Sequence, residues 1–308
     1  AEQILYGMNT IEIPERGIVR YLPSSWSEMT SAQVCHVFRL YYRCMTAARS
    51  PLEFNIRVMY YLLNIRRSWR SIMLDRLSPS AAENRNANMY VLCENCLGFM
   101  FAETAGERSP QLNFDTLTNP LTSVRTGWFR RRLVGPADSL QNITFGEFRH
   151  AATALNRFFK DNRTEDLHEC IAFLYRRPSR IPNRAGRKVR PVENGSFIRD
   201  VRRAAHIADW QKNLIMMWLA ACINYLQTGS VEIDGETVDM AALFAADNER
   251  PHSGVPSQTW TDLLIQIAKD QIVGNTERVD EEPLFSVFLI MWHNYKENKR
   301  YEKASKSH

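Results

Sequence analysis

The sequence lacks the features of membrane-spanning and secreted proteins. No apolar run approaches the roughly 20 residues that a helix needs to cross a bilayer. The best candidate, Leu214 to Leu226, is short and is interrupted by Asn224. The chain begins Ala1-Glu2-Gln3 and is not followed by an apolar segment of the kind that secretory signals carry. We therefore expect a soluble protein of the cytoplasm that has no membrane partner.

The sequence also lacks the short motifs of several large enzyme classes. It contains no Gly-x4-Gly-Lys-Ser/Thr phosphate loop, no Gly-x-Gly-x-x-Gly dinucleotide fingerprint and no nucleophile elbow. Two histidines lie near carboxylates, His206 with Asp209 and His168 with Glu169, and such pairs could act as general bases. Because no recognisable nucleophile accompanies them, we interpret them as surface hydrogen bonds. We expect a non-enzymatic protein without a cofactor.

Cysteine is too sparse to indicate a zinc domain. Among the six cysteines, Cys93 and Cys96 form the one Cys-x-x-Cys pair, which could supply half of a tetrahedral zinc site. No second pair and no His-x3-5-His segment provides the remaining ligands. We predict that the cysteines are reduced packing residues and that the protein binds no metal.

The pattern that the sequence does contain is helical. Apolar residues recur at three- and four-residue steps through most of the chain. Thr144 and Glu147 have the capping-box spacing at the start of two consecutive helices, over about 145–161 and 164–175. A long helix is predicted over 197–227, and Asp234-Gly235 predicts a hairpin. The expected fold class is mostly α, a multi-helix globular body with one small β-hairpin at about 231–238 and a long basic loop.

Two divisions of the chain are compatible with this pattern. In one, an N-terminal helical region over residues 1–177 is followed by a basic loop or linker over 178–200 and a C-terminal helical region over 201–308. In the other, the basic loop is an excursion from one continuous domain, which a chain of 308 residues can also form.

Positive charge is concentrated in two segments. From Arg176 to Arg203 there are ten Lys or Arg residues against two acids, Glu193 and Asp200, although the net charge of the chain is only +5. A second cluster follows Trp128 and Phe129, and aromatic and guanidinium groups are enriched at protein interfaces. The candidate partner-binding residues are the cations of these segments: Arg130, Arg131, Arg132, Arg180, Arg184, Arg187, Lys188 and Arg190.

The basic loop is compatible with two kinds of partner. Its cations are separated by Pro, Gly and Asn, so that a flexible segment could neutralise several phosphates. It has no interleaved aromatic residues for stacking on single-stranded bases, and only Phe197 is near. A solvated loop, or one that orders against an acidic protein surface, explains the same residues.

Five segments carry a resemblance to a group of known proteins. They are Gly135-Pro136-Ala137-Asp138, Asn142-Ile143-Thr144-Phe145-Gly146-Glu147-Phe148, Ala172-Phe173-Leu174-Tyr175-Arg176, Val231-Glu232-Ile233-Asp234-Gly235 and the closing helix from Trp292 to Lys299. In this order they resemble α-helical proteins encoded in the tail-assembly region of Bacteroidetes-type phages and prophages. The resemblance implies a virion component or tail-assembly factor, found in the host cytoplasm or the virion, and it implies no residue roles.

The prediction from the sequence is a non-enzymatic interaction protein of a phage virion or tail assembly. It would bind other proteins of that assembly, including further copies of itself, through the basic and aromatic segments. The alternative prediction is a nucleic-acid-binding protein that uses the Arg-rich loop over 176–203. A steep loss of affinity with salt would favour the alternative.

Overall fold

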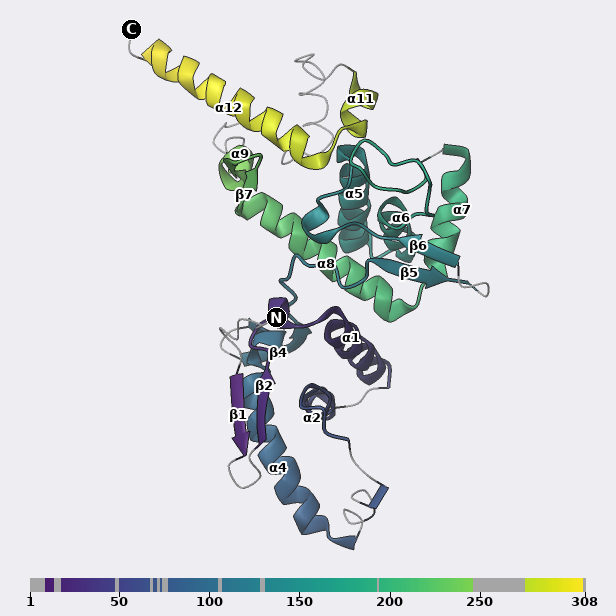
Figure 1. Ribbon diagram of the computed structural model, residues 1–308, viewed down its shortest axis with the longest axis vertical. Helices are drawn as coiled ribbons and strands as arrows, with labels where there is room; N and C mark the ends of the chain where they lie inside the picture. Colours follow the sequence, from purple (N-terminus) through teal and green to yellow (C-terminus); the bar gives the residue numbers. More distant parts are fainter. Residues whose placement is uncertain are drawn as a thin grey trace. The chain divides into compact units, whose positions relative to one another are not determined.

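The computed structural model describes residues 9–13, 18–47, 50–66, 69–70, 73, 77–104, 107–127, 131–192, 194–245 and 275–306 (Figure 1). The helically patterned segment 260–272 and the residues 128–130, including the candidate Arg130, lie outside these ranges. The described part is mostly helical, as predicted, and its sheets are small two-stranded antiparallel ones. None of the described helices is both long and apolar enough to span a membrane.

The chain folds into two compact units. The first comprises Ala1–Thr116 together with Asp209–Leu214, and the second comprises Leu117–Ala208 together with Ile215–His308. The sequence predicted a domain boundary in the basic stretch over 178–200. That stretch belongs to the second unit, which includes the chain from Leu117 to Ala208. The chain passes from one unit to the other after Thr116, after Ala208 and after Leu214.

The first unit contains helices and two β-hairpins. Its main described elements are β1 Asn9–Ile13, β2 Ile18–Leu22, α1 Ser31–Thr46, α2 Pro51–Leu62, α4 Pro79–Cys96, β3 Phe101–Thr104 and β4 Glu107–Leu112. Thr30 and Gln33 form a capping box at the start of α1, and the Ser50 side chain accepts a hydrogen bond from the Glu53 amide at the start of α2. These caps satisfy backbone N–H groups that the first helical turn leaves without partners.

Trp26 lies at the centre of the first unit's core. The centroid of its ring lies 5.9 Å from that of Phe38, 6.0 Å from that of Phe99 and 5.0 Å from that of Phe114. Its indole Nε1 donates to the backbone oxygen of Asn113 at 2.5 Å. A buried indole needs such an acceptor, so this bond fixes the loop after β4 against the aromatic core.

The second unit contains most of the predicted helices. Its main described elements are β5 Ser123–Thr126, β6 Arg131–Val134, α5 Phe145–Asp161, α6 Thr164–Leu174, α7 Asn194–Ala205, α8 Asp209–Thr228 (shared with the first unit through its first six residues), β7 Ser230–Ile233, β8 Glu236–Asp239, α9 Met240–Ala245, α11 Thr276–Glu281 and α12 Leu284–Lys306. Figure 1 shows β5 and β6 beside α6 and α7, in the teal part of the chain.

The predicted helical pair and the predicted hairpin are both present. Thr144 and Glu147 form the expected capping box of α5, which packs along α6. In the β7–β8 hairpin, Asp234 and Gly235 have φ values of 51° and 80°, as a two-residue turn with both central residues at positive φ requires. The hairpins β1–β2, β3–β4 and β5–β6 are additional to the one predicted.

The long helix predicted over 197–227 is two helices. α7 ends at Ala205, the amides of His206 and Ile207 bond three residues back, and Ala208 is extended with ψ of 139° before α8 begins. No Pro or Gly marks this break, and the apolar spacing continues across it. The prediction failed because the usual helix-breaking residues are missing where the chain changes direction.

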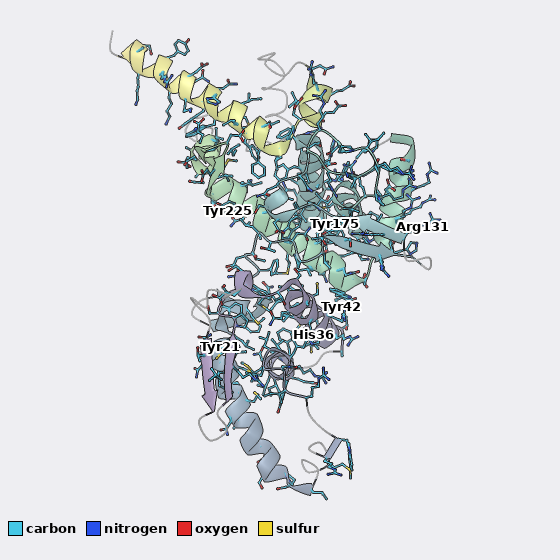
Figure 2. All side chains as sticks on the ribbon, in the orientation of Figure 1. Tyr21, His36, Tyr42, Arg131, Tyr175 and Tyr225 are labelled. Atoms are coloured by element: carbon cyan, nitrogen blue, oxygen red, sulfur yellow. The ribbon has the colours of Figure 1, made fainter. Side chains whose placement is uncertain are left out.

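Tyr175 closes the core of the second unit next to Gly135. Its hydroxyl donates to the backbone oxygen of Leu121 at 2.8 Å, which holds the ring in place (Figure 2). A Cβ atom at Gly135 would lie 2.4 Å from the Tyr175 ring and 2.9 Å from that same Leu121 oxygen. The glycine is therefore required for the close approach of the loop after β6 to this ring.

We predict that Gly135→Ala lowers the free energy of unfolding by about 1–3 kcal/mol, since the anchored ring and the carbonyl cannot both move aside. Gly195→Ala in the first turn of α7 is the matched control, because a Cβ there meets nothing within 4 Å. Urea unfolding followed by circular dichroism measures both. Equal stability of the two variants would contradict the proposed close packing.

Candidate functional site

The segment 177–192, which covers the first part of the basic loop predicted over 178–200, has a defined backbone structure. Pro178 and Val189 form an antiparallel bridge, the Arg190 amide bonds to the Arg177 oxygen at 3.0 Å, and the Asn183 amide bonds to the Arg187 oxygen at 2.9 Å. The segment is thus a closed turn hydrogen-bonded to itself. The expectation of a long flexible loop is not confirmed.

Arg187 is buried, which corrects its prediction as an exposed partner-binding residue. Its side chain is 1% exposed, and its guanidinium donates to the backbone oxygens of Leu174 and, at 2.6 Å, Val134. Its Nη1 lies 3.5 Å from Oε2 of Glu147. Arg187 therefore anchors the segment 177–192 to the interior, and its charge is not accessible to a partner.

Glu147 lies between two buried guanidiniums. Its Oε1 pairs with Arg176 and its Oε2 with Arg187, while the same carboxylate accepts the Thr144 amide of the capping box at 3.1 Å. Asn183 joins the group by donating to Oε1 at 3.3 Å. One carboxylate thereby connects α5, the end of α6 and the 177–192 segment.

Burial changes the pKa of both arginines that pair with Glu147. It lowers the pKa of Arg176, and the neighbouring positive charge of Arg187 lowers it further. Burial likewise lowers the pKa of Arg187. Glu147 is the carboxylate that pairs with both cations, and Asp200 acts on Arg176 in the same favourable sense. Such compensation is needed because an uncompensated charge in a protein interior is strongly unfavourable.

We predict that Glu147→Gln lowers the free energy of unfolding by about 3–5 kcal/mol, because it removes the carboxylate that pairs with two buried guanidiniums. The control is Glu297→Gln on the exposed part of α12, where a change within about 0.5 kcal/mol is expected. Chemical denaturation of both variants checks this. If Glu147→Gln lowered the free energy of unfolding by only about 0.5 kcal/mol, as an ordinary surface change does, the two cations would have to be compensated in another way.

The other predicted residues of this segment lie at its surface. Arg184 pairs with Glu281 at 3.4 Å and with Glu282, both at the end of α11. Arg180, Lys188 and Arg190 are exposed. The predicted set therefore separates into a buried anchor, an ion-paired residue and exposed cations, and it does not form one surface.

A groove with a volume of about 900 Å³ lies beside the same segment. Its apolar lining includes Phe173, Val189, Val192 and Phe197, and the rings of Phe173 and Phe197 lie 4.3 Å apart. Ile181, which is 78% exposed, stands among the lining residues. A groove of this size with aromatic and aliphatic walls is suited to receiving an apolar group.

α11 contributes an acidic margin to the groove, and the groove also contains a histidine. Asp280 pairs with Arg149 at 2.6 Å, and Glu277 and Glu281 are exposed on the same helix. The ring of His150 stacks on that of Phe173 at 4.9 Å. The groove therefore combines apolar walls with acids of α11, of which Asp280 and Glu281 are ion-paired with Arg149 and Arg184.

We predict that the free energy of unfolding falls as the pH drops below the ordinary histidine value of 6.5 through the contribution of His150. Burial, followed by Arg149, lowers the pKa of His150, with Arg157 acting in the same sense and Asp280 opposing it. The unfolded chain therefore takes up a proton on this residue at a higher pH than the folded one does. Urea unfolding between pH 7.5 and 5 should show a shallower decrease for His150→Gln than for the natural chain; parallel curves would contradict it.

The β5–β6 hairpin forms another candidate surface of the second unit. Arg125 lies directly opposite Arg132 in the register, and Thr126 lies opposite Arg131. All three arginines are exposed, and Figure 2 labels Arg131 at the edge of the second unit. Like charges directly opposite one another destabilise a strand pair, so the sequence of this hairpin is not optimised for stability.

The hairpin adjoins a second group of arginines around Asp200. The Thr126 hydroxyl donates to the backbone oxygen of Arg203 at 2.6 Å, which places the hairpin at the end of α7. Burial lowers the pKa of Arg177, and the like charges of three neighbouring arginines lower it further, so these side chains lie near one another. With Arg202, which lies next to Arg203 in the last turn of α7, we count five arginines in the group around Asp200: Arg177, Arg190, Arg199, Arg202 and Arg203.

We refer to the three hairpin arginines and the five around Asp200 together as the arginine cluster. Only Arg131, Arg132 and Arg190 of the predicted residues belong to it. Arg199, Arg202 and Arg203 were missed as candidates, although their spacing of three and four residues places them on one side of a helix. No spacing in the sequence indicated Arg125 as a candidate, because its place opposite Arg132 follows from the strand register.

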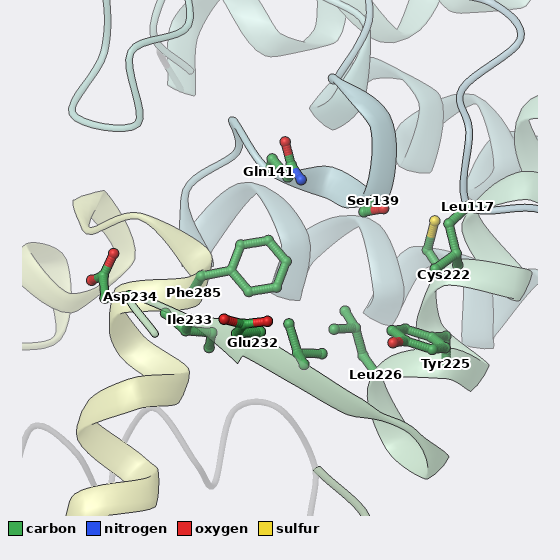
Figure 3. A pocket seen from close by; sticks show the side chains of 11 residues that line it. Leu117, Ser139, Gln141, Cys222, Tyr225, Leu226, Glu232, Ile233, Asp234 and Phe285 are labelled. Atoms are coloured by element: carbon green, nitrogen blue, oxygen red, sulfur yellow. The ribbon is translucent and has the colours of Figure 1, made fainter. Parts of the chain in front are cut away.

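A smaller pocket of about 380 Å³ lies between α8, β7 and α12 (Figure 3). Cys222, Leu226 and Phe285 give it an apolar lining, and burial raises the pKa of the Cys222 thiol. Ser139 and Leu140 nearby have φ values of 52° and 62°, an uncommon conformation for residues other than glycine. No histidine is among the lining residues, and a protonated thiol is a poor nucleophile.

Of the remaining sequence candidates, Glu169 is ion-paired with Arg157 of α5. Cys93 is buried, and burial, Cys96 and Glu94 raise its pKa to about 12, which disfavours the thiolate that zinc requires. Within the described ranges no three His, Cys, Asp or Glu residues are grouped as metal ligands. Asp209 accepts a hydrogen bond from the Tyr42 hydroxyl at 2.9 Å and pairs with Lys212 at 2.7 Å.

Comparisons with known proteins supply no further guide to the site. No protein-family model, no curated protein and no solved structure matches the chain. The surfaces of the second unit and the resemblance of the five sequence segments are the remaining guides to function.

Proposed function

We propose that the chain is a non-enzymatic interaction protein that holds a segment of a partner protein in the groove beside residues 177–192. The observation that carries the proposal is the apolar lining of this groove together with the 78% exposure of Ile181. Ile198, which follows the groove residue Phe197 in α7, is a second exposed apolar side chain, with 63% of its surface accessible. The setting implied by the resemblance makes the partner another protein of a phage virion or tail assembly.

The rigidity of the segment supports this function. Arg187 and Asn183 connect it to the interior, so its shape does not have to be fixed when a partner arrives. Pre-organisation of this kind reduces the entropy that binding loses. The chemistry of the groove favours a partner segment with apolar side chains and a Lys or Arg that faces Glu277.

The polar groups of the groove support binding over catalysis. Both oxygens of Glu147 are engaged by guanidiniums, and the capping amide adds a further bond, which leaves a weak base. Nε2 of His150 lies 3.1 Å from Nη2 of Arg149, which can only donate, so the imidazole nitrogen accepts there. Neither group has the free lone pair that a general base needs.

We predict that a photo-crosslinking amino acid at position 181 forms a covalent adduct with one protein when the chain is co-expressed with the proteins encoded beside it. The same group at Phe159, which is 58% exposed near the other end of α5, should not form that adduct. Mass spectrometry identifies the partner. Adducts of equal yield at both positions, or of many unrelated proteins, would contradict a partner site in the groove.

The purified partner then allows a quantitative test by calorimetry. Ile181→Asp should weaken binding by about 30-fold, as expected for an apolar anchor worth about 2 kcal/mol. Phe159→Asp is the matched control and should leave the affinity unchanged. Equal affinity of Ile181→Asp and the natural chain would remove the groove from the interface.

A further inference from the structure

The arginine cluster has an extreme imbalance of charge. Eight guanidiniums come from the β5–β6 hairpin, the 177–192 segment and α7, and Asp200 is the one acid among the described residues of these segments. Asp200 pairs with Arg203 and lies 4.0 Å from Arg177. A single carboxylate cannot compensate the other guanidiniums, so the cluster keeps a large positive charge at its surface.

The arrangement is unfavourable for the isolated protein. Arg125 and Arg132 face each other directly across the two strands, and the pKa of Arg177 is lowered by burial and by its like-charged neighbours. Folding therefore brings together charges that repel one another. A partner that carries many negative charges at short intervals would relieve this repulsion in the bound state.

The side-chain chemistry distinguishes between possible anions. All eight cations are arginines, whose planar guanidinium can donate two parallel hydrogen bonds to one phosphate. Arginine is also enriched at protein interfaces, but there it accompanies an apolar core from which most charged residues are excluded. Among the described residues of β5 and β6, no large apolar side chain is exposed beside the hairpin arginines.

We propose that the arginine cluster binds the sugar–phosphate backbone of a nucleic acid without reading its base sequence. This function is separate from protein binding in the groove and uses different residues. It also differs from the sequence-based alternative, because Arg187 and Arg184 take no part and the phosphates are held by the hairpin and α7. Each guanidinium that neutralises a phosphate releases counter-ions, so affinity decreases steeply with salt.

The test uses the full chain and fluorescein-labelled 25-base-pair duplexes of two unrelated sequences, one set made of DNA and one of RNA. Fluorescence anisotropy is measured between 50 and 200 mM KCl. If about six phosphates are neutralised, we expect about a 10³-fold loss of affinity across this range and the same affinity for both sequences. The DNA and RNA arms show which backbone geometry the cluster prefers.

The triple variant Arg125→Gln, Arg131→Gln and Arg132→Gln should reduce the slope of log K against log salt by about 0.9 for each phosphate that is no longer neutralised. The matched control removes the same charge from the exposed end of α12, through Lys299→Gln, Arg300→Gln and Lys303→Gln. This control should leave the slope unchanged. Urea unfolding of both triple variants establishes that they are folded.

Several outcomes would overturn the proposal. An equal reduction of the slope in the two triple variants would mean that only net charge matters. A tenfold difference between the two sequences would mean that bases are read. Absence of binding at 50 mM KCl in a folded protein, or displacement of the duplex by poly-glutamate at equal charge concentration, would exclude a phosphate backbone as the preferred partner and favour an acidic protein in the second case.

Discussion

The surfaces of the second unit depend on one carboxylate between two guanidiniums. Glu147 begins α5, Arg176 follows the end of α6, and Arg187 belongs to the turn that closes the 177–192 segment. Arg176 also pairs its backbone with Val134 of β6, and Arg187 donates to the same Val134 oxygen. A helix start, a helix end, a strand and a turn therefore meet at one buried group of charges. Its burial makes it costly to disturb, and it positions both the groove and the strand that carries part of the arginine cluster.

The two candidate surfaces have opposite chemistry. The groove combines apolar walls with acids from α11, whereas the arginine cluster is almost entirely cationic. A protein with two such surfaces on one unit is suited to holding two different partners at a fixed distance. The segment 177–192 contributes to both, because its apolar residues line the groove while Arg177 and Arg190 belong to the cluster.

Local features of the structure could be predicted from the sequence, and features that depend on distant neighbours could not. The α5–α6 pair followed from Thr144 and Glu147, and the β7–β8 turn followed from Asp234-Gly235, since caps and turns involve residues close in the chain. The position of Arg187 could not be inferred, because its burial depends on Glu147 forty residues earlier. The break between α7 and α8 has no Pro or Gly to indicate it, and the pairing of Arg125 with Arg132 required the strand register.

Helix α8 affects when the first unit can finish folding during synthesis of the chain, because part of that unit comes from α8. Its first residues, Asp209 to Leu214, belong to the first unit, where Asp209 accepts a hydrogen bond from Tyr42 and the Trp210 ring lies 4.8 Å from the Arg39 guanidinium. The other residues of that unit end at Thr116, so about a hundred further residues leave the ribosome before its last piece is available. At about 5–20 residues per second this delay lasts roughly 5–20 seconds. During that time the nascent first unit is incomplete, and a polypeptide cut after Thr116 would remain so permanently.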